Sequence, residues 1–374
     1  ATLAPDTELR GTFTVRASVP HGTVTGAGKY ETGETVTLSV AMEEGYTFYR
    51  WLGDLPDGVD AYSPEITFTA DAHRQIDGFI LMPWEAEIDS TGNLVAISNS
   101  VWHFAAQVSD GEDGVTLSSS AVSSVGQSEE LDKTVDLSTL QRDTGYRLTR
   151  LGASVFHGKL RLGSVRLVCE DILEIGDRAF LSSGVSRILP EEVFPNLETV
   201  GAAAFQGARR FVAPKVQSIG AEAFNGSSLT NFYPTTLTFP LSTKLFYKQA
   251  RLRGDFVIDS PSTTIPTMLF GACSSVSSLT VNSPVTSVEA WAFYGCSPRA
   301  KIYWNVPAPT TIDQCAFGTS GTAAAPSKPV PQLICATSKI AEGFTAFADG
   351  TTNLSYRVNF VPKEKIDSKF LTKE

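Results

Sequence analysis

The six residues IGAEAF, Ile219 to Phe224, are one copy of a phrase that recurs along the chain and decides its fold. Each copy opens with an aliphatic residue and ends five positions later with Phe, usually preceded by Ala. The copies are LGASVF (Leu151–Phe156), IGDRAF (Ile175–Phe180), VGAAAF (Val200–Phe205), IGAEAF, LSTKLF (Leu241–Phe246), IPTMLF (Ile265–Phe270), VEAWAF (Val288–Phe293) and IDQCAF (Ile312–Phe317). Successive Phe residues lie 24, 25, 19, 22, 24, 23 and 24 positions apart. Such a period is typical of stacked repeats.

A short apolar run follows most of these Phe residues, bounded by Gly, Pro, Ser or Asn as short strands are. The runs are VRLVC (165–169), VSRIL (185–189), RFVAP (210–214), LTNFY (229–233), DFVID (255–259), SLTVN (278–282), KIYWN (301–305) and QLICA (332–336). One strand per rung predicts a mainly β solenoid of about eight rungs with a parallel sheet on one face. Because rungs stack at strand spacing, about 4.8 Å, we expect each Phe ring to lie over the next.

Alternation along each run assigns its residues to the core or to the surface. In KIYWN, Ile302 and Trp304 share one face, and Lys301 and Tyr303 share the other. We predict that the outward face of these strands is the binding surface.

The N-terminal part of the chain has a different pattern. Residues 11–80 alternate with period two, as in Thr12, Thr14 and Arg16 against Phe13, Val15 and Ala17. Turn signals such as His21-Gly22 and Asp57-Gly58 separate the strands. This pattern predicts a small all-β domain with one polar face before the solenoid.

The phrase Ile-Gly-x-x-Ala-Phe-x-Gly-Cys, followed by a strand, resembles the BspA-type leucine-rich repeat. It is clearest in VEAWAFYGC (Val288–Cys296), IGAEAFNGS (Ile219–Ser227) and IGDRAFLSS (Ile175–Ser183), and the resemblance covers roughly residues 145–340. The family implies a right-handed repeat solenoid on secreted or cell-surface proteins, many of them bacterial and linked to adhesion and to host or matrix binding.

Two copies depart from the family's pattern. LSTKLF lacks both the Ile-Gly and the Ala-Phe pair, and IPTMLF has Pro266 where Gly is usual. We therefore expect distorted rungs or a longer loop there. Truncating Phe224 or Phe293 to Ala should cost about 3–5 kcal/mol, as core aromatic truncations do, and truncating Phe246 should cost less.

Residues 11–80 resemble the divergent internalin B-repeat module of bacterial surface proteins. The landmarks are Gly22-x-Val24, Gly33-x-x-Val36-x-Leu38, Gly45-Tyr46-x-Phe48, Trp51-x-Gly53-Asp54 and Ile66-x-Phe68. The resemblance implies a small, β-rich, grasp-like unit that serves as a spacer or as an auxiliary binding domain.

These patterns divide the chain into four segments. The segments are the internalin B-repeat-like β domain (1–83), a linker and N-terminal cap (84–146), the leucine-rich repeat solenoid with its C-terminal cap (147–348) and a C-terminal tail (349–374). The predicted cap elements are strands in 94–97, 101–105 and 131–140 and a short helix in 340–347. Caps are expected because an open solenoid end exposes core and strand edges.

Charge and hydropathy disfavour two kinds of partner. The net charge is −10 at pH 7, which argues against nucleic acid, and we interpret the small basic cluster Lys248, Arg251 and Arg253 as a solvated loop. No stretch approaches the roughly 18–20 apolar residues that span a bilayer. The sequence starts at Ala1 without a charged and apolar leader, so the expected extracellular or cell-surface location depends on the family resemblance.

Five cysteines are too few for a disulfide scaffold. Cys273 and Cys296 each lie three positions after a repeat Phe, so a bridge between adjacent rungs is possible, although buried thiols fit the position better. The acidic stretch Asp110–Gly114 lacks the order of a calcium loop and is interpreted as a turn. The four His residues are scattered, so we predict no metal or other cofactor.

The sequence contains no Gly-x-Ser-x-Gly elbow, phosphate loop, dinucleotide fingerprint or HExxH motif. We interpret the adjacent carboxylates of Glu191 and Glu192 as solvated, so no catalytic residue is predicted and the chain is not expected to be an enzyme.

The favoured function is adhesion, or protein or glycan binding at a cell surface or matrix, through the repeat surface. A self-associating subunit of a surface layer, appendage or filament is one alternative, and an accessory binding region of a larger secreted enzyme is another. Exposed aromatic and Arg side chains are enriched at binding hot spots. On this basis the candidate binding residues are Arg166, Arg187, Tyr233, Lys301 and Tyr303.

Overall fold

The structure is a computed structural model in which two compact units can be described. It describes residues 11–122, 134–160, 162–185, 187–189, 193–205, 208–225, 227–297, 299–313, 315–317, 332–345 and 359–362. The chain divides between Glu85 and Ala86, and Ser98–Val101 also belongs to the first unit. Each unit is considered by itself.

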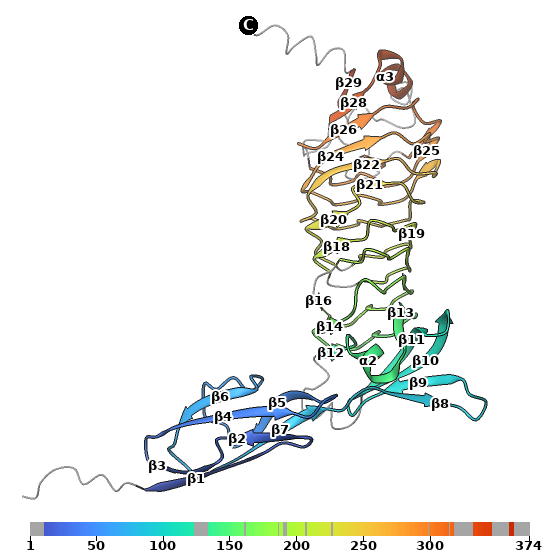
Figure 1. Ribbon diagram of the computed structural model, residues 1–374. Coiled ribbons are helices and arrows are strands. Elements are labelled where there is room, and N and C mark those ends of the chain that lie inside the picture. The colour runs from blue at the N-terminus through green and yellow to red at the C-terminus, as the bar shows by residue number, and fades with distance from the viewer. Residues whose placement is uncertain are drawn as a thin grey trace, which may run out of the picture. The chain divides into compact units, whose positions relative to one another are not determined.

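The first unit consists of two β-sheets (Figure 1). Their strand orders are β3-β1-β7-β5 and β2-β4-β6. The strands are β1 (Thr12–Ser18), β2 (Gly22–Thr25), β3 (Gly28–Glu31), β4 (Thr35–Met42), β5 (Thr47–Gly53), β6 (Glu65–Thr69) and β7 (Arg74–Leu81). β1 runs parallel to β7, and the other pairs are antiparallel. The predicted N-terminal all-β domain is confirmed.

Alternate residues of both sheets supply the core of this unit. Val36 and Leu38 of β4 are fully buried, whereas Thr37 between them is exposed. They belong to one cluster with Trp51 of β5 and Ile76 of β7, so the two sheets pack face to face. The opposite side of β1 and β7 therefore carries Arg16 and Ser18 beside Gln75 and Asp77.

The second unit opens with strands that continue directly into the repeats. These strands are β8 (Glu85–Ile88), β9 (Leu94–Ser98), β10 (Trp102–Asp110) and β11 (Gly114–Val122). β10 and β11 form an antiparallel hairpin, and β11 then pairs in parallel with β13. The predicted cap strands at 94–97 and 101–105 lie in β9 and β10. The acidic stretch Asp110–Gly114 forms the turn of the hairpin, as expected.

Each predicted rung strand is present along one side of the stack, in three sheets within which neighbouring strands pair in parallel (Figure 1). The sheets are β12-β14-β16, β18-β20 and β21-β22-β24-β26-β28-β29. Their strands are β12 (Thr134–Asp136), β14 (Ser164–Arg166), β16 (Arg187–Leu189), β18 (Arg210–Val212), β20 (Asn231–Tyr233), β21 (Thr236–Leu237), β22 (Gly254–Ile258), β24 (Val276–Val281), β26 (Lys301–Trp304), β28 (Gln332–Cys335) and β29 (Asn359–Pro362).

A second line of short strands, not predicted from the sequence, lies on another side of the stack (Figure 1). It comprises β13 (Arg147–Leu151), β15 (Glu174–Ile175), β17 (Thr199–Val200), β19 (Ser218–Ile219), β23 (Thr264–Ile265), β25 (Ser287–Val288) and β27 (Thr311–Ile312). Each of them ends on the aliphatic residue that opens a repeat phrase. The line is interrupted between β19 and β23, at the phrase LSTKLF, which agrees with the distortion expected there.

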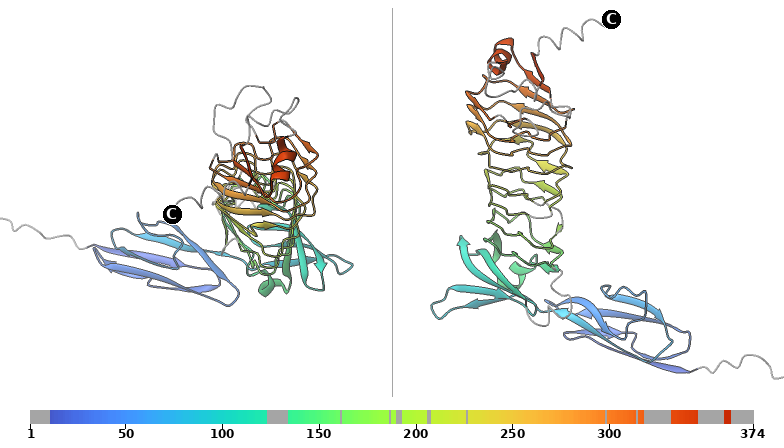
Figure 2. Two further views of the ribbon diagram at one scale, coloured as in Figure 1. Left: turned by 90° about the horizontal axis from the view of Figure 1, so that it is seen from above. Right: turned by 180° about the vertical axis from the view of Figure 1, so that it is seen from behind.

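The repeat Phe rings stack inside the solenoid at six of the seven steps of the expected ladder, whereas no ring contact joins Phe270 to Phe293 among the described residues. Figure 2 shows the rungs following one another along the stack. Ring centroids are 5.3 Å apart for Phe156 and Phe180, 5.7 Å for Phe180 and Phe205, 5.5 Å for Phe205 and Phe224, 6.5 Å for Phe224 and Phe246, 5.0 Å for Phe246 and Phe270, and 5.2 Å for Phe293 and Phe317.

Phe246 is closely packed among aromatic rings, although its repeat phrase is degenerate. It is fully buried, and its ring contacts those of Phe224, Phe232, Phe256 and Phe270 at centroid distances of 4.8–6.5 Å. The strands of the same region contribute two further rings, so truncating Phe246 is now expected to cost as much as truncating Phe224. The short strand that ends on the first residue of the other phrases is absent at LSTKLF. Phe246 is nevertheless packed among aromatic rings in the core.

Each rung turns a tight corner within the phrase. The fourth residue of seven phrases has a positive φ, at Ser154 (60°), Arg178 (56°), Ala203 (50°), Glu222 (57°), Lys244 (57°), Met268 (57°) and Trp291 (55°). All seven side chains are at least partly exposed at the corner. The second residue lies against the previous rung, where a Cβ on Gly201 would come within 2.3 Å of the backbone nitrogen of Asp177. This close approach explains the Gly of the phrase.

Short elements flank the repeats. Helix α2 (Leu140–Thr144) follows β12, whose Val135 is buried as the predicted last cap strand requires. Helix α3 (Ser338–Thr345) overlaps the predicted C-terminal helix, and its Phe344 packs edge-on against Trp304 at 5.1 Å. Strand β29 lies inside the segment predicted as a tail and pairs with β28. The last residues, 363–374, lie outside the described part of the chain.

Candidate binding surfaces

Strand β26 carries two of the predicted binding residues. Lys301 is exposed and Tyr303 is half-buried, whereas Ile302 and Trp304 are fully buried, so the predicted alternation is confirmed. Strand pairing places Tyr303 beside Thr280 of β24. The outward positions of these strands thus form parallel columns along the solenoid.

The other three candidates lie on two further sheets, with Arg166 and Arg187 on one and Tyr233 on the other. Arg166 of β14 is exposed, and its Nε lies 3.4 Å from Oδ2 of Asp136, so its charge is paired. Arg187 is on β16, and its side chain is outside the described part of the structure. Tyr233 ends β20 and is 51% exposed. Of the five candidates, the two on β26 share a strand, and Arg166 and Arg187 lie on neighbouring strands of one sheet.

A more concentrated group of aromatic side chains lies at the corners of the rungs. We call Tyr247, Met268, Trp291 and Tyr294 the turn-edge cluster. Trp291 is 37% exposed, and the other three are partly exposed. The remaining four Trp residues of the chain are buried at 3% exposure or less: Trp51, Trp84, Trp102 and Trp304. Trp291 is therefore the exposed Trp of this protein.

Gly271 lies at the centre of the turn-edge cluster. A Cβ placed on it would lie 3.1 Å from Cδ2 of Tyr247, 3.3 Å from Cβ of Met268 and 3.3 Å from the backbone oxygen of Trp291. The ring of Tyr247, the Cβ of Met268 and the backbone of Trp291 therefore surround a position that has no side chain of its own. The fourth, Tyr294, occupies the position equivalent to Gly271 in the next rung.

The basic side chain of Lys248 borders the turn-edge cluster. Lys248 and Arg251 are exposed, as expected for a solvated loop, and Nζ of Lys248 lies 5.0 Å from the ring centroid of Tyr247. Neither forms an ion pair within the described ranges. Lys244 is different, because it binds Glu222 at 2.7 Å and lowers the pKa of that carboxyl. The unpaired positive charge lies beside the aromatic side chains.

Strand alternation does not predict this cluster, because its residues lie at the corners between the strands. The available signal was the variation within the repeat phrase. Its fourth position changes from Ser154 to Lys244, Met268 and Trp291 while the core positions keep their character. A bulky aromatic residue at a variable, exposed repeat position is typical of a binding surface.

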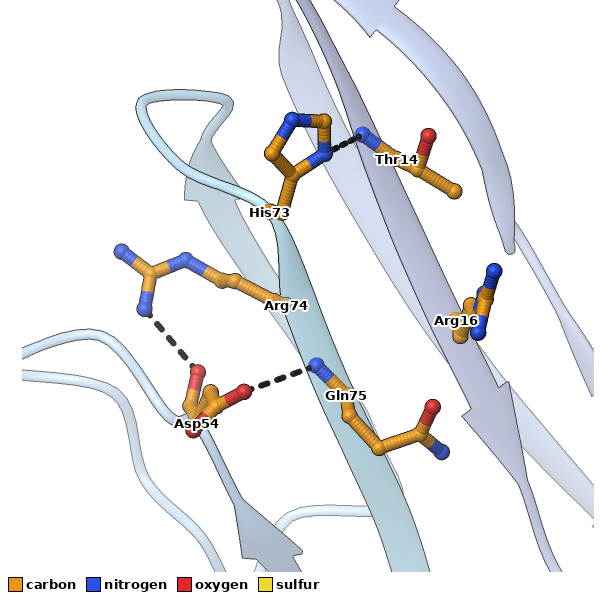
Figure 3. A pocket seen from close by; sticks show the side chains of 6 residues that line it. All are labelled: Thr14, Arg16, Asp54, His73, Arg74 and Gln75. Atoms are coloured by element: carbon orange, nitrogen blue, oxygen red, sulfur yellow. Dashed lines mark hydrogen bonds between the residues drawn. The ribbon is translucent and has the colours of Figure 1, made fainter.

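The first unit contains a polar pocket of about 430 Å³ on strands β1, β5 and β7, shown in Figure 3. It is lined by Thr14, Arg16, Asp54, His73, Arg74 and Gln75. Strand pairing aligns Arg16 with Gln75, so these two side chains share one face of the sheet. Nδ1 of His73 accepts a hydrogen bond from the backbone N–H of Thr14 at 3.0 Å. No sequence pattern pointed to this pocket.

The five cysteines are free and buried. Sγ of Cys273 lies 2.8 Å from the backbone oxygen of Phe246, and burial together with the nearby Cys296 raises the pKa of Cys273 well above its usual value. Burial also raises the pKa of Cys296 to about 12 and that of Cys335 to about 11. These thiols are protonated core groups, which is the interpretation that the sequence favoured.

An ion-pair network joins the hairpin turn to the first rung. Arg150 binds both carboxylate oxygens of Asp110, with Nε–Oδ2 and Nη2–Oδ1 distances of 2.8 and 2.9 Å, and also contacts Glu174. The hydroxyl of Thr149 donates to Asp110 at 2.6 Å. Hydrogen bonding to Arg150 is the largest cause that lowers the pKa of Asp110 to about 2. The carboxylate of Asp110 is therefore held by Arg150 and Thr149 of the first rung.

Within the described ranges, neither a metal-binding group nor a membrane-spanning helix is found. No group of three or more His, Cys, Asp or Glu side chains there is arranged to hold a metal ion. No helix there is long and apolar enough to cross a membrane. Glu191 and Glu192 lie outside the described residues.

Both parts of the chain match known families. Residues 138–253 and 240–323 match the BspA type leucine rich repeat region, in six copies, and residues 12–77 match the divergent InlB B-repeat domain. The chain combines these two modules. The BspA-type repeats account for the Phe ladder and the rung strands, and the InlB B-repeat domain accounts for the two-sheet unit.

Comparison with other proteins adds little to these matches. No curated protein matches the chain. Among solved structures, "The Crystal structure of Pneumococcal vaccine antigen PcpA" is 10% identical and covers 72% of this chain and 98% of its own, with a TM-score of 0.25.

Proposed function

We propose that this BspA-type repeat protein is a non-enzymatic surface protein that binds a partner protein through the turn-edge cluster of its solenoid. The observation that carries the proposal is the exposure of Trp291 within a cluster of aromatic and Met side chains. Trp and Tyr are enriched at binding hot spots, and soluble proteins rarely leave such side chains grouped on the surface. Leucine-rich repeat regions commonly mediate protein binding, which supports the same conclusion.

The chemistry of the cluster indicates the kind of segment that it binds. An apolar or aromatic side chain of the partner would pack on Trp291 and Tyr247. Acidic side chains of the same segment would meet Lys248 and Arg251, which are exposed and unpaired within the described ranges. Such charge complementarity supplies specificity and a faster encounter. We therefore assign an acidic protein segment with an apolar anchor as the partner.

Peptide selection on the full-length chain tests this proposal. A displayed peptide library is panned on the native protein and on Trp291→Ala, and enriched peptides are titrated while Trp emission is recorded. We expect peptides with Asp or Glu beside an aromatic or aliphatic residue to bind the native chain and to lose affinity for the variant by about tenfold or more. Because Trp291→Ala lacks this fluorophore, affinities for both proteins are measured by isothermal titration calorimetry. In the native chain, where the other four Trp residues are buried, a change in Trp emission on peptide addition indicates binding at the cluster.

The strand-face prediction provides the matched comparison. The double variant Lys301→Ala/Tyr303→Ala removes the two candidates on β26 and leaves the turn-edge cluster unchanged. Unaltered peptide binding by this variant supports the cluster as the site. Loss of binding here, but not in Trp291→Ala, would move the site to the strand face. Retained binding in both variants would exclude both surfaces.

A further inference from the structure

The polar pocket of the InlB B-repeat domain lies outside the repeats and has a consistent chemistry of its own. None of its six lining residues is an aliphatic or aromatic hydrocarbon side chain. We propose that it binds an acidic saccharide, with the sugar carboxylate at Arg16 and the sugar hydroxyls at Asp54 and Gln75.

Hydrogen-bond donors line one part of the pocket. Arg16 is exposed, and its guanidinium has no partner in the part of the chain that the structure describes. Because Nδ1 of His73 accepts the N–H of Thr14, the neutral imidazole carries its proton on Nε2, which is left as a donor. The hydroxyl of Thr14 lines the same pocket. A guanidinium with two neighbouring donors is suited to a carboxylate.

Hydrogen-bond acceptors line the other part. Oδ2 of Asp54 accepts the backbone N–H of Gln75 at 3.1 Å, which leaves its second carboxylate oxygen available. The side-chain amide nitrogen of Gln75 donates to Asp77 at 2.9 Å, and so its side-chain oxygen remains an acceptor. Sugar hydroxyl groups are hydrogen-bond donors that can use both oxygens. A simple inorganic anion would not use this half of the pocket.

Arg74 supports the pocket wall. Its Nη1 donates to the backbone oxygen of Asp54 at 2.9 Å, its Nη2 donates to Asp71 at 2.6 Å, and its guanidinium lies 5.8 Å from the ring centroid of Phe68. Figure 3 shows Arg74 and Asp54 on one side of β7, with Arg16 and Thr14 on the other. Arg74 is therefore held by the protein and fixes Asp54, while Arg16 remains available for a ligand.

Size and polarity favour a saccharide over other acids. A cavity of about 430 Å³ falls within the range of small-molecule sites, roughly 300–1,000 Å³. A fatty acid or an aromatic acid would need apolar lining for its hydrocarbon part, which this pocket does not offer. A ligand with a carboxylate and several hydroxyl groups satisfies both the donors and the acceptors.

Ligand-detected NMR with the full chain tests this assignment. The probes are D-glucuronate, D-glucose and inorganic sulfate. Glucuronate carries both a carboxylate and hydroxyl groups, glucose carries only the hydroxyl groups, and sulfate carries only negative charge. We expect saturable binding of glucuronate, with glucose and sulfate each bound more weakly. Arg16→Gln should weaken glucuronate binding by about 10- to 100-fold, as expected for losing a charged hydrogen-bond donor, and Arg16→Lys should restore part of it.

Arg253→Gln is the matched control, because it removes an exposed Arg from the other unit and should leave glucuronate binding unchanged. A thermal melt of Arg16→Gln close to that of the native chain confirms that the domain is folded. The assignment is overturned if glucuronate does not bind saturably, if glucose or sulfate binds as tightly, or if Arg16→Gln binds like the native protein. The pocket and the turn-edge cluster lie in different units. The presence or absence of glucuronate binding therefore does not affect the proposed protein-binding role, which the peptide experiment tests separately.

Discussion

The ring of Phe246 stacks on that of Phe270 at a centroid distance of 5.0 Å, inside the rung whose sequence departs furthest from the repeat phrase. Phe232 meets the same ring edge-on at 4.8 Å. Phe246→Ala is therefore expected to cost about 3–5 kcal/mol, as much as Phe224→Ala, because both leave a cavity in a closed aromatic core. Denaturant unfolding followed by circular dichroism measures the difference.

Tyr233→Ala serves as the control for that measurement. Tyr233 is 51% exposed, and its truncation should change the free energy of unfolding by no more than about 0.5 kcal/mol. A loss at Phe246 well below that at Phe224 would show that the degenerate rung is loosely packed after all.

The Phe ladder could be predicted from the sequence, but the packing around each ring could not. The spacing of the phrase places Phe246 in line with its neighbours. The rings of Phe232 and Phe256 come from strands that the phrase does not include, and only the folded coil brings them to it. The two-residue strands such as β15 could not be predicted either. A strand is recognised from alternation of apolar and polar residues, and this pattern needs more than two positions.

Gly201 is a second position where rung stacking fixes the residue. A Cβ there would lie 2.3 Å from the backbone nitrogen of Asp177 and 2.5 Å from the carbonyl carbon of Gly176. We expect Gly201→Ala to cost about 1–3 kcal/mol, because the backbone of one rung must move away from the next. Thermal unfolding monitored by circular dichroism provides the readout.

Gly28→Ala is the comparison for Gly201→Ala. Its added Cβ would meet nothing closer than Cε2 of Tyr30, at 3.9 Å. This substitution should therefore be nearly neutral. Equal melting temperatures for Gly201→Ala and the native chain would mean that the rungs are spaced more widely than described here.

The bidentate pair of Asp110 and Arg150 predicts a pH dependence of stability. The pKa of Asp110 is lowered from 3.8 to about 2 in the folded chain, so the ionised form is the one that stabilises the fold. Its contribution, about 1–2 kcal/mol, is present above pH 4 and is lost as the pH falls through 2. Asp110→Asn should thus destabilise the protein at pH 7.

Comparison of free energies of unfolding at the two ends of this pH range isolates the effect. The gap between the native chain and Asp110→Asn should close toward pH 2, where the native carboxyl is increasingly protonated. A gap of the same size at both ends would indicate that Asp110 acts through packing or neutral hydrogen bonds instead of its charge.

The binding surface was less predictable than the fold. Lys301 and Tyr303 were found because strand alternation identifies outward residues. Trp291 was not, because its side chain becomes exposed through a backbone corner with a φ of 55°, which periodicity does not encode. The polar pocket depends on Arg16 and Gln75 being paired across parallel strands that lie far apart in the sequence. Only tertiary structure brings such residues together.

The thiols of Cys273 and Cys296 are expected to resist modification in the native state. Burial raises the pKa of Cys296 to about 12, so at pH 8 only about one molecule in ten thousand carries the reactive thiolate. Iodoacetamide at pH 8 should therefore leave the native chain unlabelled at both positions, and denaturant should expose all five cysteines together. Intact-mass spectrometry counts the added groups. Rapid labelling of either thiol, or a mass deficit from a bridge between them, would contradict their assignment as buried core groups.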